Sequence, residues 1–236
     1  MTMTSPPYDT QSWTARTAAA SHTLDEIDAA VVFIANEDAS LRDELELLMY
    51  SAGWHAETFA SAGEFLARPR PTVPSCLVLD VSLPDVNGLD LQKSFAADRP
   101  DMPVVFITGH NDVSMSVRAM KAGAVDFLTK PFRNGMLLAA VQQALERSRR
   151  ALAHAARMGA LRDRHSLLTP REREVMRLVA SGLLNKQVGG ELGISEITVK
   201  AHRGQVMRKM QADSLPALVH MVAWLDSNAS PLAPAV

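Results

Sequence analysis

The first half of this chain alternates short apolar runs with stretches whose apolar side chains recur every three or four residues. Two stretches show this helical spacing, at Leu41, Leu45 and Leu48 and at Val113, Val117 and Met120. Short buried strands that alternate with helices predict a parallel sheet covered on both faces. We therefore expect a doubly wound α/β domain with five parallel strands at residues 31–35, 55–59, 77–79, 104–107 and 125–128, of which 55–59 is a weaker edge strand.

Polar side chains follow the predicted strands at the points where the strands end. In a doubly wound sheet the carboxyl ends of the strands lie at one edge, and ligands bind there. Asp80 is central to this set, because it closes an apolar run and leads directly into a turn, in the stretch CLVLDVSLPDVNG. No member is specific alone, but the ordered set predicts a site formed by Asn36, Glu37, Asp38, Asp80, Thr108 and Lys130.

Three motifs accompany this polar set: LPDVNG behind Asp80, VVFITGH at 104–110 and MKAGAVDFLTKPF at 120–132. Together they resemble the receiver domain of two-component response regulators, over about residues 27–147. The resemblance implies that Asp80 accepts a phosphoryl group from a histidine kinase, and that Lys130 and Thr108 contact the phosphate oxygens. It also implies a cis peptide bond between Lys130 and Pro131, and an aromatic switch in which Phe127 turns inward together with Thr108.

The resemblance further implies Mg²⁺, which would join Asp80 to acidic neighbours and to the backbone carbonyl of Ser82. One departure bears on this metal, because the family has two adjacent acidic residues where this chain has Asn36 and Glu37. Glu37 keeps a charge on a longer side chain, whereas Asn36 keeps only an acceptor oxygen. Since Mg²⁺ demands near-octahedral geometry, we expect a weak site of Glu37, Asp80 and the Ser82 carbonyl, with Asn36 bound weakly or through water.

Charge divides the chain into two halves of opposite sign. Residues 1–146 carry 10 Lys and Arg against 19 Asp and Glu, a net charge of −9, and residues 147–236 carry 14 against 7, a net charge of +7. The near-neutral total therefore conceals an acidic part followed by a basic part. A basic part favours nucleic acid as its partner.

The basic half contains the start and stop signals of three helices. Thr169, Pro170 and Glu172 form a capping box with proline at the first helical position, which predicts a helix to about residue 181. A second helix is expected at 186–192, a left-handed turn at Gly193, and a third helix from the cap Ser195 to about residue 210. This arrangement is typical of a helix-turn-helix. The third helix would bury Val199, Val206 and Met210 and present Lys200, Ala201, Gly204 and Arg208 to a major groove.

Four stretches of this half, LTPREREV, GLLNKQV, LGISEITVKAHR and SLPALVHMVAWL, occur in that order. They resemble the four-helix LuxR-type DNA-binding domain of response regulators similar to NarL and FixJ, over about residues 167–225. Gly204 and the Gly189-Gly190 pair depart from the family, and each interior glycine costs about 1 kcal/mol against alanine. The resemblance implies binding to double-stranded DNA, with base contacts from Lys200, Ala201 and Gly204 and phosphate contacts from Lys186, Thr198, Arg203 and Lys209.

The order of the two regions is similar to that of the FixJ-type regulators. Apolar residues between Leu138 and Ala155, at a mixed spacing of three, four and seven, predict that the last receiver helix continues through the linker. Such a helix could pair with a second protomer, so we expect a homodimer on activation. The expected parts are a disordered extension at 1–28, a receiver domain at 29–146, a helical linker at 147–166, a LuxR-type domain at 167–227 and a flexible tail at 228–236.

Composition narrows the setting. The single cysteine, Cys76, permits no internal disulfide and is expected to be a small buried residue. No apolar run reaches membrane-spanning length, and residues 1–25 lack the pattern of a signal peptide, so we expect a cytoplasmic protein without a membrane partner.

Three functions follow from these observations. The leading hypothesis is a transcription factor that binds DNA when Asp80 is phosphorylated. The second is a DNA-binding protein whose receiver never takes a phosphoryl group and serves as an interaction or dimerisation platform, an alternative that the Asn36-Glu37 pair makes credible. The third, an enzyme with Asp80 as nucleophile, is the weakest, because no phosphate-cradling glycine loop or further catalytic pair is visible in the sequence.

Overall fold

The structure is a computed structural model that describes residues 30–227 except 70, 97 and 110–112. The expected extension at 1–28 and the tail at 228–236 lie outside the described residues. The chain divides into two compact units, the first ending at Arg149 and the second starting at Arg150. Among the described residues no helix combines the length and the apolar character that crossing a membrane requires.

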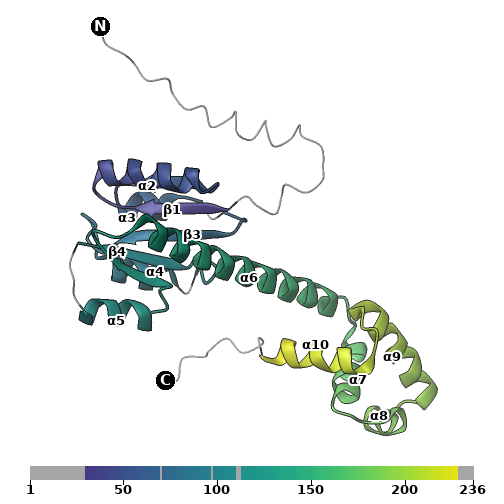
Figure 1. The fold of residues 1–236 in the computed structure, drawn as a ribbon. Coiled ribbons are helices and arrows are strands. Elements are labelled where there is room, and N and C mark those ends of the chain that lie inside the picture. Colours follow the sequence, from purple (N-terminus) through teal and green to yellow (C-terminus); the bar gives the residue numbers. More distant parts are fainter. Residues whose placement is uncertain (1–29, 70, 97, 110–112, 228–236) are drawn as a thin grey trace, which may run out of the picture. The chain divides into compact units, whose positions relative to one another are not determined.

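A five-stranded parallel sheet forms the centre of the first unit (Figure 1). Its strand order is β2-β1-β3-β4-β5, which confirms the expected doubly wound fold and the position of residues 55–59 at an edge. The third strand is longer than expected and includes Asp80, which pairs in register with Ile107. The strands are β1 (Val31–Ala35), β2 (His55–Phe59), β3 (Ser75–Asp80), β4 (Val104–Thr108) and β5 (Asp126–Thr129).

Helices cover both faces of this sheet because side chains of successive strand residues point to opposite faces. On one face, α2 (Ala39–Ser51) and the start of α6 (Asn134–Ser166) pack Met49 and Val141 against Ile34 and Val78. On the other face, Phe33 and Leu79 pack against α3 (Ala62–Ala67), α4 (Gly88–Ala96) and α5 (Val113–Lys121). Cys76 lies in the first of these cores, and burial raises the pKa of its thiol, as expected for a packing residue.

The helix α6 runs without a break for 33 residues. This confirms that the last receiver helix continues through the expected linker. Leu137, Val141 and Leu145 pack on the sheet, whereas Met158 and Leu161 belong to the core of the second unit. The two halves of one helix are therefore stabilised by different cores. Pairing of this helix with a second protomer stays a prediction.

The second unit contains four further helices, α7 (Pro170–Ala180), α8 (Asn185–Leu192), α9 (Glu196–Met210) and α10 (Leu215–Ser227). The capping box of Thr169 and Glu172 forms as expected, and the Ser195 side chain accepts from the Thr198 amide at the start of α9. Gly193 ends α8 with φ of 65°, so the helix-turn-helix is confirmed. Two core clusters hold the helices together, one around Val175, Val188 and Val199 and the other around Met176, Val206 and Met210.

Gly189 has a structural role that the sequence did not reveal. A Cβ atom on this glycine would lie 2.8 Å from the backbone oxygen of Ile194. Glycine is therefore required where the chain turns back against α8, and its propensity cost does not mark a weak helix. Gly190 and Gly204 have open space around them, so no close contact requires glycine at those two positions.

Candidate functional site

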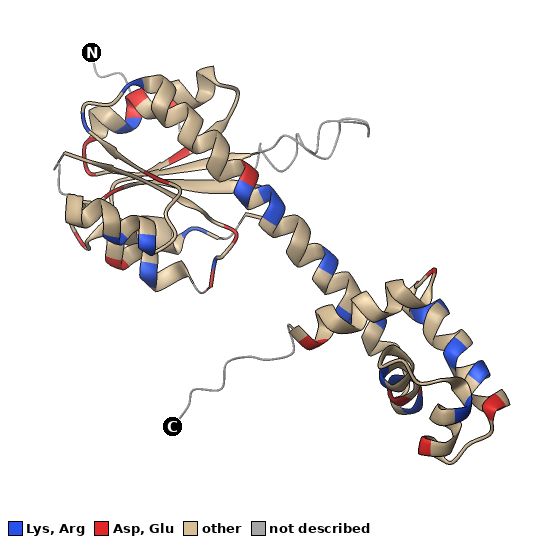
Figure 2. Ribbon diagram, turned by 60° about the horizontal axis from the view of Figure 1, so that its bottom comes forward, with Lys and Arg blue, Asp and Glu red and all other residues tan. Residues whose placement is uncertain are grey.

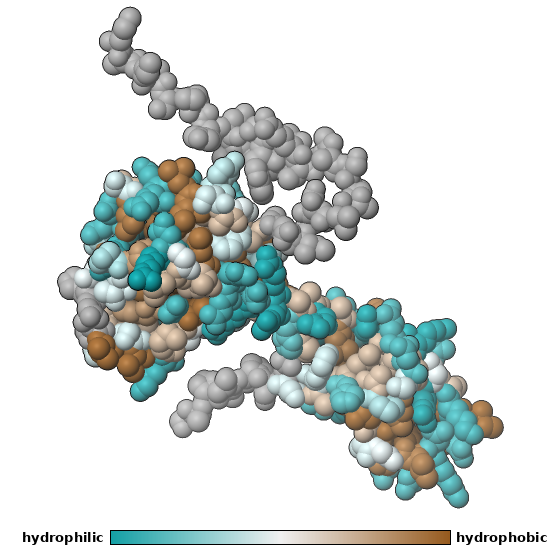
Figure 3. Space-filling view, viewed as in Figure 1, coloured by the Kyte–Doolittle hydropathy of each residue, from teal (hydrophilic) through white to brown (hydrophobic). Residues whose placement is uncertain are grey.

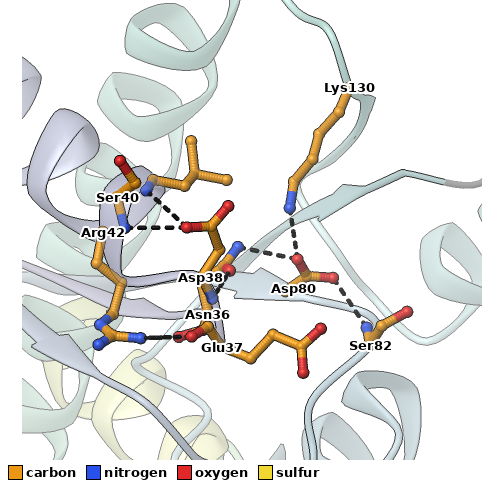
Figure 4. Close-up of polar contacts among 9 residues, drawn as sticks. Asn36, Glu37, Asp38, Ser40, Arg42, Asp80, Ser82 and Lys130 are labelled. Atoms are coloured by element: carbon orange, nitrogen blue, oxygen red, sulfur yellow. Dashed lines mark hydrogen bonds and ion pairs between the residues drawn. The ribbon is translucent and has the colours of Figure 1, made fainter.

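Asp80 is the last residue of β3, and its side chain is nearly buried, with 4% of the residue exposed. Its Oδ2 accepts hydrogen bonds from Lys130 Nζ at 2.6 Å and from Asn36 Nδ2 at 2.8 Å. Its Oδ1 accepts from the Ser82 backbone amide at 2.8 Å. Figure 4 shows these three donors, from three different loops, around one carboxylate. The structure thus brings together Asn36, Asp80, Ser82 and Lys130, which the sequence placed after three different strands.

The sheet edge holds these loops in place through backbone contacts. The Lys130 amide donates to the Thr108 carbonyl at 2.7 Å, and the peptide bond between Lys130 and Pro131 is cis, as the resemblance implied. Behind Asp80, the Gly88 amide donates to the Val81 carbonyl at 2.9 Å. A Cβ atom on Gly88 would lie 2.6 Å from the Asp80 carbonyl oxygen, so only glycine lets α4 start this close to β3. This role of Gly88 was not predicted from the sequence, although glycine at the end of a turn motif is a usable signal.

Asn36 is completely buried, and the direction of its amide group differs from the expectation. Its Oδ1 accepts a hydrogen bond from the Asp38 amide at 2.8 Å, while its Nδ2 donates to Asp80. The Asp38 N–H can only donate, so it fixes which end of the Asn36 amide faces which neighbour. Asn36 therefore presents a donor to Asp80. A metal ion bound directly by Asn36 would need the amide oxygen on this side, so the expected weak or water-mediated contact of Asn36 with Mg²⁺ stays a prediction.

The loop from Asn36 to Asp38 is held by its own helix. The Asp38 side chain caps α2 by accepting from the Ser40 and Leu41 amides at 2.9 and 3.3 Å, so Asp38 is a capping residue. Arg42 Nη1 donates to the carbonyls of Asn36 and Glu37 at 2.7 and 2.9 Å. The role of Arg42 was not predicted from the sequence, because its partners are backbone oxygens that no side-chain motif indicates.

Thr108 and Phe127 occupy the positions that the resemblance assigned to a switch. Thr108 ends β4 and is fully buried, paired in register with Thr129 of β5. The Phe127 ring is half-buried and lies 6.2 Å from the Phe106 ring, centroid to centroid. Their location fits the expected pair, and movement between two states stays a prediction.

Some, but not all, of the residues expected at this site present oxygen atoms that could bind Mg²⁺. In Figure 4 the Glu37 side chain extends along the same end of the sheet toward Asp80 and Ser82. Two carboxylates and a backbone carbonyl are the hard oxygen ligands that Mg²⁺ prefers. Asn36 does not fit, because its nitrogen faces Asp80. Within the described residues, no three His, Cys, Asp or Glu side chains form a group that could hold a metal ion.

The second candidate surface is the exposed face of α9. Lys200, Ala201, Gly204 and Arg208 are all exposed there, as expected, opposite the buried Val199, Val206 and Met210. Lys200 Nζ lies 3.1 Å from Glu196 Oε1, an exposed ion pair that water and salt weaken. Figure 2 shows Lys and Arg recurring along the helices of this unit. The face is thus available to a polyanion.

The other expected phosphate contacts differ in how free their side chains are. Lys186 is exposed, Thr198 shares a hydrogen bond of 2.8 Å with Ser195, and Arg203 donates to Asn185 Oδ1 at 3.3 Å. Lys209 is held inside the unit, where its Nζ lies 2.7 Å from Glu172 Oε2 and 3.1 Å from the Leu167 carbonyl. Its ammonium group already donates to two acceptors within the unit, so we do not propose Lys209 as a phosphate contact. The sequence pattern could not reveal this, since the partners are 37 residues apart.

Two protein-family models match this chain, one in each unit. Residues 32–142 match the response regulator receiver domain, and residues 166–222 match the bacterial regulatory proteins of the luxR family. Nodulation protein W of Bradyrhizobium diazoefficiens is 49% identical over 201 residues, which cover 85% of this chain and 88% of that protein. Response regulator protein TodT of Pseudomonas putida is 42% identical over 200 residues, which cover 85% of this chain and 88% of that protein.

One solved structure and a third relative are also similar to this chain over most of its length. The low-resolution structure of the response regulator StyR is 44% identical with a TM-score of 0.75, covering 83% of this chain and 99% of StyR. Transcriptional regulatory protein FixJ of Bradyrhizobium diazoefficiens is 38% identical over 190 residues, which cover 80% of this chain and 93% of FixJ. The chain therefore belongs to the response regulators, and with a receiver domain followed by a LuxR-type DNA-binding domain it is a transcriptional regulator.

Proposed function

We propose that a histidine kinase phosphorylates Asp80 and that this change controls DNA binding by the second unit. The observation that carries the proposal is the buried Asp80 carboxylate, surrounded by Lys130, Asn36 and the Ser82 amide. Phosphoryl transfer depends mainly on positioning and on neutralising charge. The Lys130 ammonium and the Asn36 amide would hold the acceptor oxygens and stabilise the charge that the phosphoryl group adds.

The proposal is tested by measuring DNA affinity before and after incubation with a small phosphodonor and Mg²⁺. We expect the treated protein to bind a selected DNA site more tightly, in fluorescence anisotropy with labelled DNA. Protein that gains a phosphoryl group by intact mass, without any change in DNA affinity or oligomeric state, would contradict the switch.

Mg²⁺ would bind beside Asp80 through Asp80, Glu37 and the Ser82 carbonyl, and it would neutralise charge on the phosphoryl oxygens. We propose that this site is weak, because Asn36 supplies no negative charge and turns its nitrogen toward Asp80. Glu37 is exposed, and its carboxylate lies at the end of a flexible side chain. Weak metal binding would make phosphorylation depend on the Mg²⁺ concentration.

Asn36→Asp should tighten Mg²⁺ binding, because it restores a carboxylate beside Asp80. The expected change is about tenfold in Kd, the effect of roughly 1.4 kcal/mol from one additional charged ligand. Titration of Mg²⁺ monitored by Trp54 fluorescence or by calorimetry measures it. Asp43→Asn serves as a control of opposite charge change on the exposed side of α2. Equal or weaker Mg²⁺ binding by Asn36→Asp would refute the proposed cause.

For the DNA interface we propose that Lys200 reaches a base edge while Lys186 contacts the phosphate backbone. Lys200→Ala should cost about 1 to 3 kcal/mol of DNA binding and relax specificity at one base position. Lys186→Ala should weaken all sequences alike and reduce the salt dependence of binding. Footprinting and anisotropy on a selected site and its single-base variants separate the two. If Lys200→Ala leaves both affinity and preference intact, α9 does not read bases in the proposed way.

A homodimer on activation is also part of the proposal. Apolar side chains gather over α5 in Figure 3, and Val113, Val117 and Met120 are 73%, 46% and 49% exposed. Apolar surface of this kind on a helix favours association with another protein surface. The receiver domain of a second copy would be the partner.

The second candidate is a regulator that works without phosphorylation, and Asn36 favours it. Asp80 already receives three hydrogen bonds, one of them from the residue that replaces a carboxylate of the family pattern. The receiver would then act as an interaction platform. An enzyme with Asp80 as nucleophile is disfavoured, because the relatives at 38% to 49% identity are named as regulators.

A further inference from the structure

A groove of about 440 Å³ lies inside the second unit, between α7, α10 and the C-terminal end of α6. Its volume falls in the range of pockets that bind ligands. The floor is apolar and is formed by Met176, Val222 and Leu225. Met176 is buried in the core cluster of Val206 and Met210, the inner face of α9. Neither α8 nor α9 lines the groove, so the core separates it from the exposed face of α9.

The walls of this groove carry an excess of positive charge. Arg162, Arg173 and Arg177 line it, against a single carboxylate, Asp226. Burial and the neighbouring Arg173 lower the pKa of His165, an effect that Asp226 opposes, so His165 adds no charge near neutral pH. The arginines therefore give the groove a net positive charge. An anionic partner fits it electrostatically.

The arginines have hydrogen-bonding capacity that the unit itself does not use. Arg173 Nη2 donates to the Ser166 carbonyl at 3.1 Å, but its Nε is buried without a hydrogen-bond partner among the described residues. Arg162 and Arg177 form no ion pair with any residue that the structure describes. The exposed guanidinium groups of Arg162 and Arg177 can donate N–H hydrogen bonds to a molecule in the groove. This points to a ligand that carries oxygen acceptors.

The spacing of the cations indicates the shape of the partner. Arg173 and Arg177 are four residues apart on α7, so they lie one above the other on the same face. Arg162 on α6 adds a third cation to the lining of the groove. Carboxylates one helical turn apart would meet the α7 pair, and an apolar face on the same helix would cover Met176 and Val222. DNA phosphates would match the charge but leave the apolar floor exposed.

We propose that this groove binds an acidic amphipathic helix of a partner protein. The proposal rests on the second unit alone and does not depend on phosphorylation of Asp80. It adds a protein-binding surface to the domain, separate from the exposed face of α9 that is proposed to read DNA.

The test uses the full chain and a fluorescein-labelled peptide of about 15 residues, long enough to form a helix. The peptide is built from glutamate and leucine, with glutamates one turn apart on one face, and a second peptide replaces every glutamate with glutamine. Anisotropy should show binding of the glutamate peptide and no binding of the glutamine peptide. Lack of binding by the wild-type chain to the glutamate peptide would overturn the proposal.

Paired variants locate the binding site. Arg162→Gln with Arg177→Gln should weaken peptide binding about tenfold, since two ion pairs at the rim are lost. Arg157→Gln with Arg164→Gln changes the charge by the same amount on α6 outside the groove and should leave binding within about twofold of the wild type. Both pairs should bind a selected DNA site as the wild type does. Equal weakening by the two pairs would mean nonspecific attraction, and it would overturn the proposal.

A charge reversal separates loss of binding from loss of folding. Arg162→Glu with Arg177→Glu should reject the glutamate peptide and bind a peptide with lysine in place of glutamate. Weaker DNA binding by Arg162→Gln with Arg177→Gln, with peptide binding unchanged, would assign the groove to the DNA backbone and overturn the proposal.

Discussion

Asp80→Asn should abolish the mass gain of one phosphoryl group that the wild-type chain is expected to show with a small phosphodonor and Mg²⁺. The carboxylate oxygen is the nucleophile of the proposed transfer, and an amide cannot replace it. Asparagine has nearly the same shape, so the contacts with Ser82 and Lys130 change in hydrogen bonding more than in packing. We therefore expect a complete loss of labelling, measured by intact mass, in a folded protein.

Asp43→Asn is the matched control for this experiment, because it makes the same chemical change on the exposed side of α2. It should be labelled as fully as the wild type. Undiminished labelling of Asp80→Asn would mean that another residue accepts the phosphoryl group. A wild-type chain that binds DNA normally yet is never labelled would support the phosphorylation-independent regulator.

Lys209→Met should destabilise the second unit by about 2 kcal/mol. The Lys209 side chain is 27% exposed and the Glu172 side chain is 7% exposed, so the ion pair is partly buried. Removing one partner of a fully buried pair costs about 3 to 5 kcal/mol, and the exposure of Lys209 reduces that figure. Glu172 would keep its bond to the Thr169 amide at 2.8 Å but lose its only ion pair among the described residues.

Hydrogen exchange followed by mass spectrometry measures this effect, because it reports opening of α7 and α9 separately from the first unit. Lys186→Met, an exposed lysine without such a pair, is the control and should change exchange little. Equal exchange in the two variants would show that the pair between Lys209 and Glu172 does not stabilise the unit.

The same pair predicts a pH dependence. Burial alone would raise the pKa of Glu172, but the hydrogen bonds from Lys209 and Thr169 outweigh it and lower the pKa below its ordinary value. The stabilisation is therefore present above the unfolded-state pKa of about 4.3 and is lost as the pH falls through the lower folded-state value. Lys209→Met should reduce this acid sensitivity of the second unit.

Local patterns in the sequence predicted much of the fold and part of the site. Apolar runs located β1, β3 and β4, because these strands are buried on both faces and must be apolar over most of their length. The capping box at Thr169 and the left-handed turn at Gly193 depend only on neighbouring residues, and both formed as expected. The convergence of Asp80 and Lys130 followed from the rule that parallel strands end at one edge.

Tertiary structure alone decided which atoms of these residues face one another. The sequence shows an asparagine at position 36, but the Asp38 amide decides that its nitrogen faces Asp80. The sequence shows a lysine at 209, but the packing of α7 against α9 decides that Glu172 holds it. Gly189 is an unfavourable helix residue by propensity, yet the returning backbone at Ile194 requires it. Propensities and caps act over a few residues, whereas hydrogen-bond direction, ion pairing and close backbone approach depend on elements that only the folded chain brings together.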